Sequence, residues 1–300
     1  MRVLGSVERA ALAVAVLGLL VAGVVVATEG STFPGRPEVA LALAPAAAVG
    51  CVVAGPYLAP DRGSVGLPAG TALCATGPLV IDRPGTVIDG WDVRGGIVVD
   101  AADVLVRRSR ITGDGVSPYG IRTTERGSVR IEDTTVTGDF PEAGIGDSRW
   151  TAERVEIGGV THDGARLGPG ATMRNSWLHD FDPAPGSEST ALALLVPDGD
   201  VLVEDNRVEM GTGPGYGSAL LIAPGRAGDR TGGGSVLIRG NILGGGEYTV
   251  DQATGASELT DVRLTGNRFH RGAGVQPLRV PTTAVLVDNT FVDGGRITPR

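Results

Sequence analysis

The sequence predicts an all-β protein, built as a single-stranded right-handed parallel β-helix, which is a solenoid of about nine coils. Composition supports this, because the 300 residues are 42% apolar and include 48 glycines, yet only 4% are aromatic. The core must therefore consist of Val, Ile, Leu and Ala in short strands joined by glycine-containing turns. In addition, one short pattern recurs along the chain, and apolar residues alternate within each copy with the period of a strand.

The N-terminal 29 residues have the features of an export segment. Arg2 and Arg9 precede an uninterrupted apolar run at residues 10–27, which ends in small residues that a signal peptidase could recognise. The length of the run is at the lower limit for a helix that spans a membrane, so an uncleaved signal anchor is the alternative. We expect an extracellular or cell-surface protein that contacts the membrane only through this segment.

The remainder divides into a linker and one domain. Residues 30–59 are rich in Ala, Pro and Gly, which predicts a linker, and residues 60–300 carry the repeat and form the β-helix domain. Cys51 and Cys74 are the only two cysteines. In an oxidising compartment they most simply form a disulfide, and closing that loop would stabilise the domain by roughly 3 kcal/mol.

The repeat reads apolar, any, apolar, two polar or small residues, a small polar residue, any, apolar. Its small polar position falls at residues 109, 134, 176, 206, 241, 267 and 289, and two weaker copies place Trp91 and Val155 at the same position. The last four of these positions are Asn206, Asn241, Asn267 and Asn289. Because asparagine tolerates a left-handed backbone and its amide can bond to the same residue in the next coil, we expect an asparagine ladder at this turn.

A further short strand precedes each copy of the repeat, as at residues 96–100, 120–124, 144–148, 164–168, 191–195 and 219–223. Each coil then supplies three strands to three parallel sheets. Coils stack at about 4.8 Å, so nine of them make a rod roughly 40 Å long.

Three stretches resemble the pectate-lyase-like right-handed parallel β-helix superfamily, especially its secreted bacterial members. They are ATMRNSWLHD at residues 171–180, LPAGT at 67–71 and GTVIDG at 85–90, and the resemblance covers about residues 60–295. It implies a substrate groove along the first sheet, walled by the long turn that leads into that sheet. Proteins of this architecture include lyases, hydrolases, and binding or adhesion proteins, so the resemblance does not select an activity.

The candidate site residues lie on the first sheet and in the turns before it. Arg122 and Arg166 are expected on its outer face, and Asp182 in a turn; of these, Arg122 and Asp182 are candidates to bind substrate. Catalysis would fall to His162, Asp163, Arg166, His179 and Asp180. In a lyase, an arginine would neutralise a uronate while a histidine moves the proton; in a hydrolase, Asp163 would act with Asp180 or Asp182 as the carboxylate pair.

Asp114 and Asp139 are candidate metal ligands. They belong to turns of successive coils, so their carboxylates would lie about 5 Å apart. Carboxylates at that distance repel each other or recruit a cation, and oxygen ligands would favour Ca²⁺. Calcium is the one cofactor that the sequence suggests.

We therefore expect an exported β-helix protein that binds an extracellular polysaccharide or another cell-surface component. If the protein is an enzyme, we expect it to cleave the polysaccharide as a lyase or a glycoside hydrolase. Several catalytic patterns of polygalacturonase-like and pectate-lyase-like enzymes, such as Gly-His-Gly and Trp-Ile-Asp-His, are absent, so the sequence leaves catalysis open. The alternative is a non-catalytic structural or adhesive solenoid. Nucleic acid is disfavoured as a partner, because the net charge is -8 and no basic stripe is visible.

Overall fold

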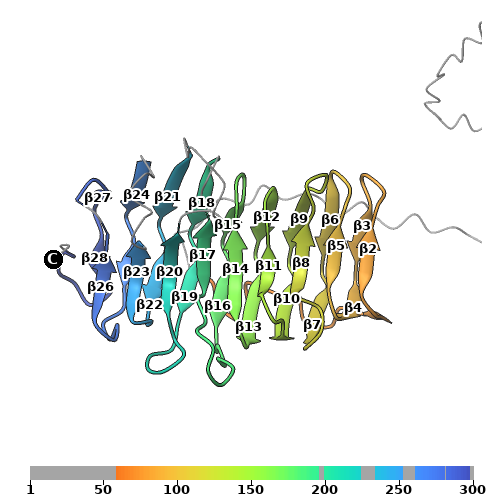
Figure 1. Cartoon of the computed structure of the whole chain (residues 1–300), viewed down its shortest axis with the longest axis horizontal. Coiled ribbons are helices and arrows are strands. Elements are labelled where there is room, and N and C mark those ends of the chain that lie inside the picture. The colour runs from red at the N-terminus through yellow and green to blue at the C-terminus, as the bar shows by residue number, and fades with distance from the viewer. Residues whose placement is uncertain (1–58, 196–198, 224–233, 253–260, 281, 298–300) are drawn as a thin grey trace, which may run out of the picture. The chain divides into compact units, whose positions relative to one another are not determined.

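The chain forms a parallel β-helix of about nine coils, as the sequence predicts. The computed structural model describes residues 59–195, 199–223, 234–252, 261–280 and 282–297. Within them, strands from successive coils lie side by side in three sheets, and every pairing between the strands of these sheets is parallel. Figure 1 shows the coils stacked in order from β2 to β26 along the long axis of the solenoid.

The three sheets take every third strand of the chain. Sheet A contains β1 (Cys74–Thr76), β4 (Trp91–Arg94), β7 (Arg110–Asp114), β10 (Thr135–Asp139), β13 (Glu156–Val160), β16 (Trp177–His179), β19 (Arg207–Glu209), β22 (Ile242–Gly244), β25 (Arg268–Phe269) and β28 (Thr290–Phe291). Sheet B contains β2 (Leu79–Ile81), β5 (Ile97–Val99), β8 (Tyr119–Thr123), β11 (Ala143–Gly146), β14 (Asp163–Leu167), β17 (Leu192–Leu195), β20 (Ser218–Ala223), β23 (Tyr248–Gln252) and β26 (Gln276–Arg279). Sheet C contains β3 (Val87–Asp89), β6 (Val104–Arg107), β9 (Val129–Glu132), β12 (Trp150–Glu153), β15 (Thr172–Arg174), β18 (Val201–Glu204), β21 (Ser235–Arg239), β24 (Asp261–Thr265) and β27 (Val285–Val287).

The core is a set of aliphatic stacks inside the coils. Val201 and Val203 are buried while Leu202 between them is half-buried on the outside, as the alternation predicts. Val203 pairs in register with Ile238 of the next coil, and Ile238 with Leu264 of the one after. Each apolar side chain therefore packs on its equivalents in the coils above and below. Stacks of Val, Ile and Leu can therefore form the core without large aromatic rings.

The turn from sheet C to sheet A corrects one detail of the sequence interpretation. The left-handed residue of this turn is the one before the ladder position, and not the asparagine itself. Positive φ values occur at Gly90, Arg108, Asp133, Arg154, Asn175, Asp205, Gly240, Gly266 and Asp288, each directly before one of the nine repeat positions. Asparagine is preferred at the next position because its side chain turns inward and bonds between coils.

The asparagine ladder runs through this turn inside the solenoid. Asn206 Nδ2 donates to Asn241 Oδ1 at 3.0 Å, Asn241 Nδ2 to Asn267 Oδ1 at 2.9 Å, and Asn267 Nδ2 to Asn289 Oδ1 at 2.9 Å. The same oxygens accept the backbone N–H of the preceding asparagine at 2.8–3.1 Å. The amide oxygens of Asn241, Asn267 and Asn289 thus each accept two hydrogen bonds, so none of these buried oxygens is left unsatisfied.

The segment before β1 lies against inner coils of sheet A, and the last coil is covered in part by the C-terminal turn. Before β1, Gly66 N–H donates to Arg154 O at 2.8 Å and Leu67 N–H to Thr135 Oγ1 at 2.9 Å, which ties the incoming chain to sheet A. After β28 the chain turns back, Arg296 forms an antiparallel bridge to Thr290, and Ile297 is buried against the core. This C-terminal turn covers the edge of sheet A at Thr290.

Some predictions concern residues that lie outside the described ones. The export segment at 1–29, the linker up to residue 58 and Cys51 belong to this group. Cys74, at the start of β1, is exposed and free in the structure, so the disulfide stays a prediction. Within the described ranges, no helix is long and apolar enough to cross a membrane.

Candidate functional site

Sheet B is the sheet that the long turns lead into, so it corresponds to the predicted groove sheet. The turns from sheet A to sheet B stand along one edge of its outer face. The two longest, residues 180–191 and 210–217, are the green and teal loops that extend beyond the lower edge of the solenoid in Figure 1. The outer face and this row of turns together hold most of the predicted site residues.

Arg166 on β14 is held by a cluster of acidic and phenolic groups. Its Nε donates to Asp163 Oδ2 at 2.8 Å, and its Nη1 donates to Glu142 and to the Tyr119 hydroxyl. Burial lowers the pKa of Arg166, but the ion pairs with Asp163 and Glu142 outweigh it, so that the pKa is raised overall. Arg166 is therefore fixed in its charged form and oriented by the protein.

Asp163 is the less exposed of the two carboxylates in this cluster, with a side chain 14% exposed. Its Oδ1 accepts the Thr190 backbone N–H at 2.9 Å, while Oδ2 faces Arg166. Burial raises the pKa of the Asp163 carboxyl, and the pairing with Arg166 offsets only part of that effect. Both oxygens are thus occupied by protein partners, which suits a structural role for Asp163 better than attack on a substrate.

Arg122 on β8 occupies a different environment on the same outer face. It pairs in register with Val98 on one side and Gly146 on the other. Its guanidinium lies 6.0 Å from the Tyr119 ring centroid, the same distance as that of Arg166. Among the described residues Arg122 has no carboxylate in salt-bridge distance.

His162 and the two predicted metal ligands lie in neighbouring turns. Thr161 Oγ1 donates to Asp139 Oδ1 at 2.6 Å and lies 3.1 Å from His162 Nδ1, whereas His162 Nδ1 is 4.0 Å from Asp139. Asp114, in register with Asp139, accepts the backbone N–H groups of Ser117 and Val116, which lower its pKa. In the described part of the chain no group of three or more His, Cys, Asp and Glu side chains is placed to hold a metal ion.

His179 does not join the Arg166 cluster, because it lies on the outer face of sheet A. Its ring stacks on Trp177 with a centroid distance of 3.7 Å, and it packs over Gly158 of the neighbouring coil. Nδ1 lies 2.8 Å from Asp180 Oδ2 and Nε2 lies 3.2 Å from Glu156 Oε1. Burial lowers the pKa of His179, but these two carboxylates outweigh burial and raise it.

The five predicted catalytic residues thus separate into three places. Asp163 and Arg166 form one ion-paired cluster on sheet B, His162 lies in the turn before it, and His179 with Asp180 lies at the end of a sheet A strand. Asp182 is exposed in the turn that follows. Because these residues lie in successive coils, the sequence suggested that they are close together. However, consecutive strands of the chain belong to different sheets, so their side chains face different directions.

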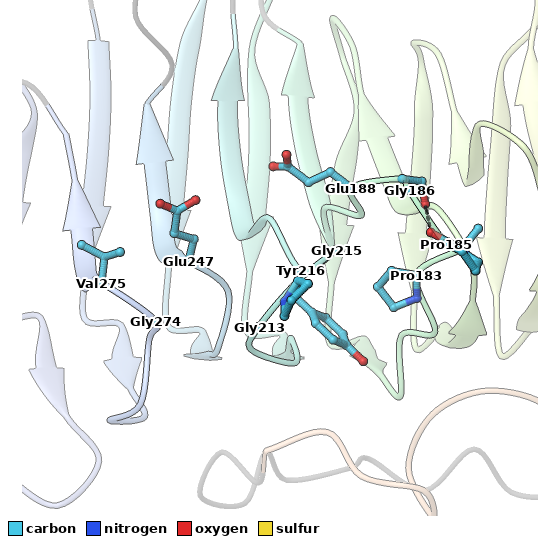
Figure 2. A pocket seen from close by; sticks show the side chains of 13 residues that line it. Pro183, Pro185, Gly186, Glu188, Gly213, Gly215, Tyr216, Glu247, Gly274 and Val275 are labelled. Atoms are coloured by element: carbon cyan, nitrogen blue, oxygen red, sulfur yellow. Dashed lines mark hydrogen bonds between the residues drawn. The ribbon is translucent and has the colours of Figure 1, made fainter.

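A further candidate binding site was not predicted from the sequence. It is a cleft of about 730 Å³ between the turns before sheet B. Its walls come from four coils: residues 183–188, 213–216, 247 and 274–275. Figure 2 shows Glu188 and Glu247 extending to one side of these turns, with the Tyr216 ring directed to the other side, towards Pro183.

Backbone hydrogen bonds between successive turns hold the cleft in shape. Gly217 N–H donates to Ser189 O at 2.8 Å, Glu247 N–H to Gly217 O at 2.6 Å, and Val275 N–H to Glu247 O at 2.8 Å. These bonds continue the β-helix stacking into the turns. The cleft is therefore largely preformed, as binding sites usually are.

Glycine makes room for the aromatic wall of the cleft. A Cβ at Gly211 would lie 2.3 Å from Tyr216 Cε1, so the ring packs directly on that backbone. The Tyr216 hydroxyl donates to Phe181 O at 3.1 Å, which fixes the ring in place. The enlarged coil steps of 30 and 35 residues between positions 176, 206 and 241 are the sequence signal that could have drawn attention to these turns.

The cleft is acidic, and the nearby arginines do not neutralise it. Its lining includes Glu188 and Glu247 and no basic side chain. On the adjoining face of sheet B, Arg166 is bound to Asp163 and Glu142, and Arg279 forms a two-bond ion pair with Asp251 at 2.5 Å. The two arginines of sheet B that lie nearest the cleft therefore already have carboxylate partners.

The fold places this chain among the parallel β-helix proteins, whose sites lie on sheet faces and in the turns that border them. Comparison with known proteins adds nothing to that class, because no family model, no curated protein and no solved structure matches the chain.

Proposed function

We propose that the protein binds an extracellular polysaccharide in the cleft beside sheet B. One observation carries the proposal: a contiguous, preformed cleft with an aromatic wall and two carboxylates, built from the turns of four coils. A sugar ring has an apolar face and a polar edge, which match an aromatic or proline surface and hydrogen-bond acceptors respectively. The cleft volume also lies in the range that small-ligand sites occupy.

The elongated geometry favours a polymer over a small molecule. The cleft is open and extends across four stacked turns, so a bound chain can run along the solenoid from one coil to the next. Each turn then meets a different sugar unit of the same chain. This arrangement is typical of solenoid proteins, which use extended surfaces for binding.

Binding without cleavage is the form of the proposal that the side chains support best. Asp163 and Arg166 are committed to each other, and His179 is buried on another sheet. Proton transfer in a lyase or hydrolase needs an acid and a base within reach of the same sugar bond. Export through residues 1–29, and membership in the pectate-lyase-like superfamily, belong to the same proposal and rest on the sequence alone.

The test is a binding and turnover assay on a panel of neutral, acidic and basic polysaccharides with the full-length protein. We expect binding to at least one polymer, without unsaturated products or new reducing ends. Tyr216→Ala should weaken binding by about tenfold, because it removes the aromatic wall. Glu125→Gln, in the turn between β8 and β9, is the matched control and should bind as the unchanged protein does.

Three outcomes would change the proposal. Unsaturated products would establish a lyase, and new reducing ends without unsaturation would establish a hydrolase. Absence of binding across the panel would reject polysaccharide as the ligand and favour a structural or adhesive solenoid. Equal binding by Tyr216→Ala and the unchanged protein would show that the ligand binds elsewhere on the surface.

A further inference from the structure

The charge of the cleft restricts which polysaccharide it can accept. Glu188 and Glu247 line it from turns two coils apart, and neither carboxylate has an ion-pair partner among the described residues. Glutamate side chains carry negative charge at neutral pH. A ligand in the cleft therefore meets two negative charges that no residue in the described part of the chain pairs with.

The nearest cation without a carboxylate partner on sheet B is too far along the solenoid to compensate them. Arg122 lies on β8, and the first turn of the cleft leads into β17, three strands further along sheet B. At about 4.8 Å per strand this separation is about 14 Å, which exceeds the Debye length at physiological ionic strength. Arg122 therefore leaves the charge of the cleft unchanged.

Three classes of glycan respond differently to this field. A uronate polymer would bring its carboxylates towards Glu188 and Glu247 and be repelled. A neutral polymer would bind through ring packing and hydroxyl hydrogen bonds alone. A polymer with free amino groups would add charge-assisted hydrogen bonds from its ammonium groups to the two carboxylates.

We infer that the cleft is a site for an amino-sugar polymer with free, protonated amino groups. This inference rests on the proposed function, because it names the substrate class of the same cleft. Glu188 and Glu247 bind the ammonium groups of two different sugar units. Tyr216 and Pro183 contact the apolar faces of the sugar rings on the other side of the cleft.

The decisive experiment compares three oligosaccharides of equal length on the full-length protein by calorimetry, in mildly acidic buffer in which amino groups are protonated. The probes are oligomers of glucosamine, of N-acetylglucosamine and of galacturonate. An exposed ion pair contributes about two- to fivefold in affinity, so two of them should make the glucosamine oligomer bind about four- to twenty-five-fold more tightly than its acetylated counterpart. Added salt should reduce that preference.

Variants assign the preference to the cleft. Glu188→Gln and Glu247→Gln should each lower affinity for the glucosamine oligomer about two- to fivefold and leave affinity for the acetylated oligomer unchanged. Glu125→Gln removes one negative charge at an exposed position outside the cleft and should leave both affinities unchanged. If Glu125→Gln weakened binding as much as the cleft variants, general attraction to an acidic protein would explain the preference and the inference would fall.

The failure of this inference differs from failure of the proposed function. Equal affinity for the two glucosamine-based oligomers, or preference for galacturonate, would overturn the amino-sugar assignment while leaving polysaccharide binding in place. If none of the three oligomers bound and no polysaccharide of the panel bound, both the amino-sugar assignment and the proposed function would be overturned.

Discussion

His179 Nε2 lies 3.2 Å from Glu156 Oε1, although the two residues are 23 positions apart in the chain. They belong to neighbouring strands of sheet A, and Thr135 of the next coil bonds to the second oxygen of Glu156 at 3.0 Å. The same Thr135 hydroxyl accepts the Leu67 N–H of the segment that precedes β1. The imidazole thus ends a chain of contacts that joins three coils to the incoming segment.

His179 should make stability depend on pH. Its pKa in the folded protein is raised above the ordinary value of 6.5 by Glu156 and Asp180, against the opposing effect of burial. Such a group contributes stability fully below the unfolded pKa, and that contribution disappears as pH rises through the folded pKa. The free energy of unfolding should therefore fall between about pH 6 and a pH above the raised pKa, and His179→Gln should remove about 1 kcal/mol of that dependence. Urea unfolding at several pH values measures it; an unchanged slope in His179→Gln would show that other groups cause the dependence.

The asparagine ladder should tolerate no truncation. Asn241→Ala leaves the backbone N–H of Asn206 and the Asn206 amide without their acceptor in a fully buried turn, and it removes the bond to Val203 O. We expect a loss of about 2–4 kcal/mol in the free energy of unfolding, measured by denaturant titration. Asn175→Gly is the contrasting variant, because Asn175 has a φ of 49° and lies outside the ladder. Asn175→Gly should leave the free energy of unfolding nearly unchanged.

The residue before each ladder position should be limited by its backbone conformation. Asp288 has a φ of 52°, a region that β-branched residues rarely adopt. Asp288→Val should destabilise the protein by about 1–2 kcal/mol, whereas Asp288→Gly should cost little. Thermal unfolding of the two variants makes the comparison, and equal melting temperatures would contradict the assignment of strain.

Arg166 and Arg122 should differ in their effect on stability, although both lie 6.0 Å from the Tyr119 ring. Arg166→Ala leaves the half-buried Asp163 without its cation, for an expected loss of about 2 kcal/mol in the free energy of unfolding. Arg122→Ala breaks no ion pair in the described structure and should change stability by less than about 0.5 kcal/mol. Arg166→Lys should rescue only part of the loss, because an ammonium group cannot reproduce the forked contacts to Asp163 and Glu142. Denaturant titration of the three variants tests this ranking.

Much of the fold could be predicted from the sequence because the repeat is local. Strand alternation at Val201 and Val203, and the shared register of Asn206, Asn241, Asn267 and Asn289, are visible along the chain, and stacking turns that register into contacts. The left-handed residue was assigned one position too late, since sequence alone does not separate a side chain that bonds inward from a backbone that turns.

The candidate site was predicted much less well, for a physical reason. In a solenoid, the position of a residue in the chain determines which coil it belongs to. Which side chains come into contact depends also on the sheet and on the direction in which each side chain points. His179 and Arg166 are 13 positions apart and lie on different sheets, whereas Glu188 and Glu247, 59 positions apart, line one cleft.

The sequence by itself determined the class of fold, the number of coils and the position of the internal ladder, because each coil must repeat the same burial and hydrogen-bonding pattern to pack on its neighbours. Only the tertiary structure decided which charges are paired, that the predicted catalytic residues separate, and that the unequal turns leave a cleft with two carboxylates that no described residue neutralises. The turns differ from coil to coil in length and sequence, so the repeat does not predict their contacts. Those contacts depend on how the stacked coils place neighbouring turns side by side.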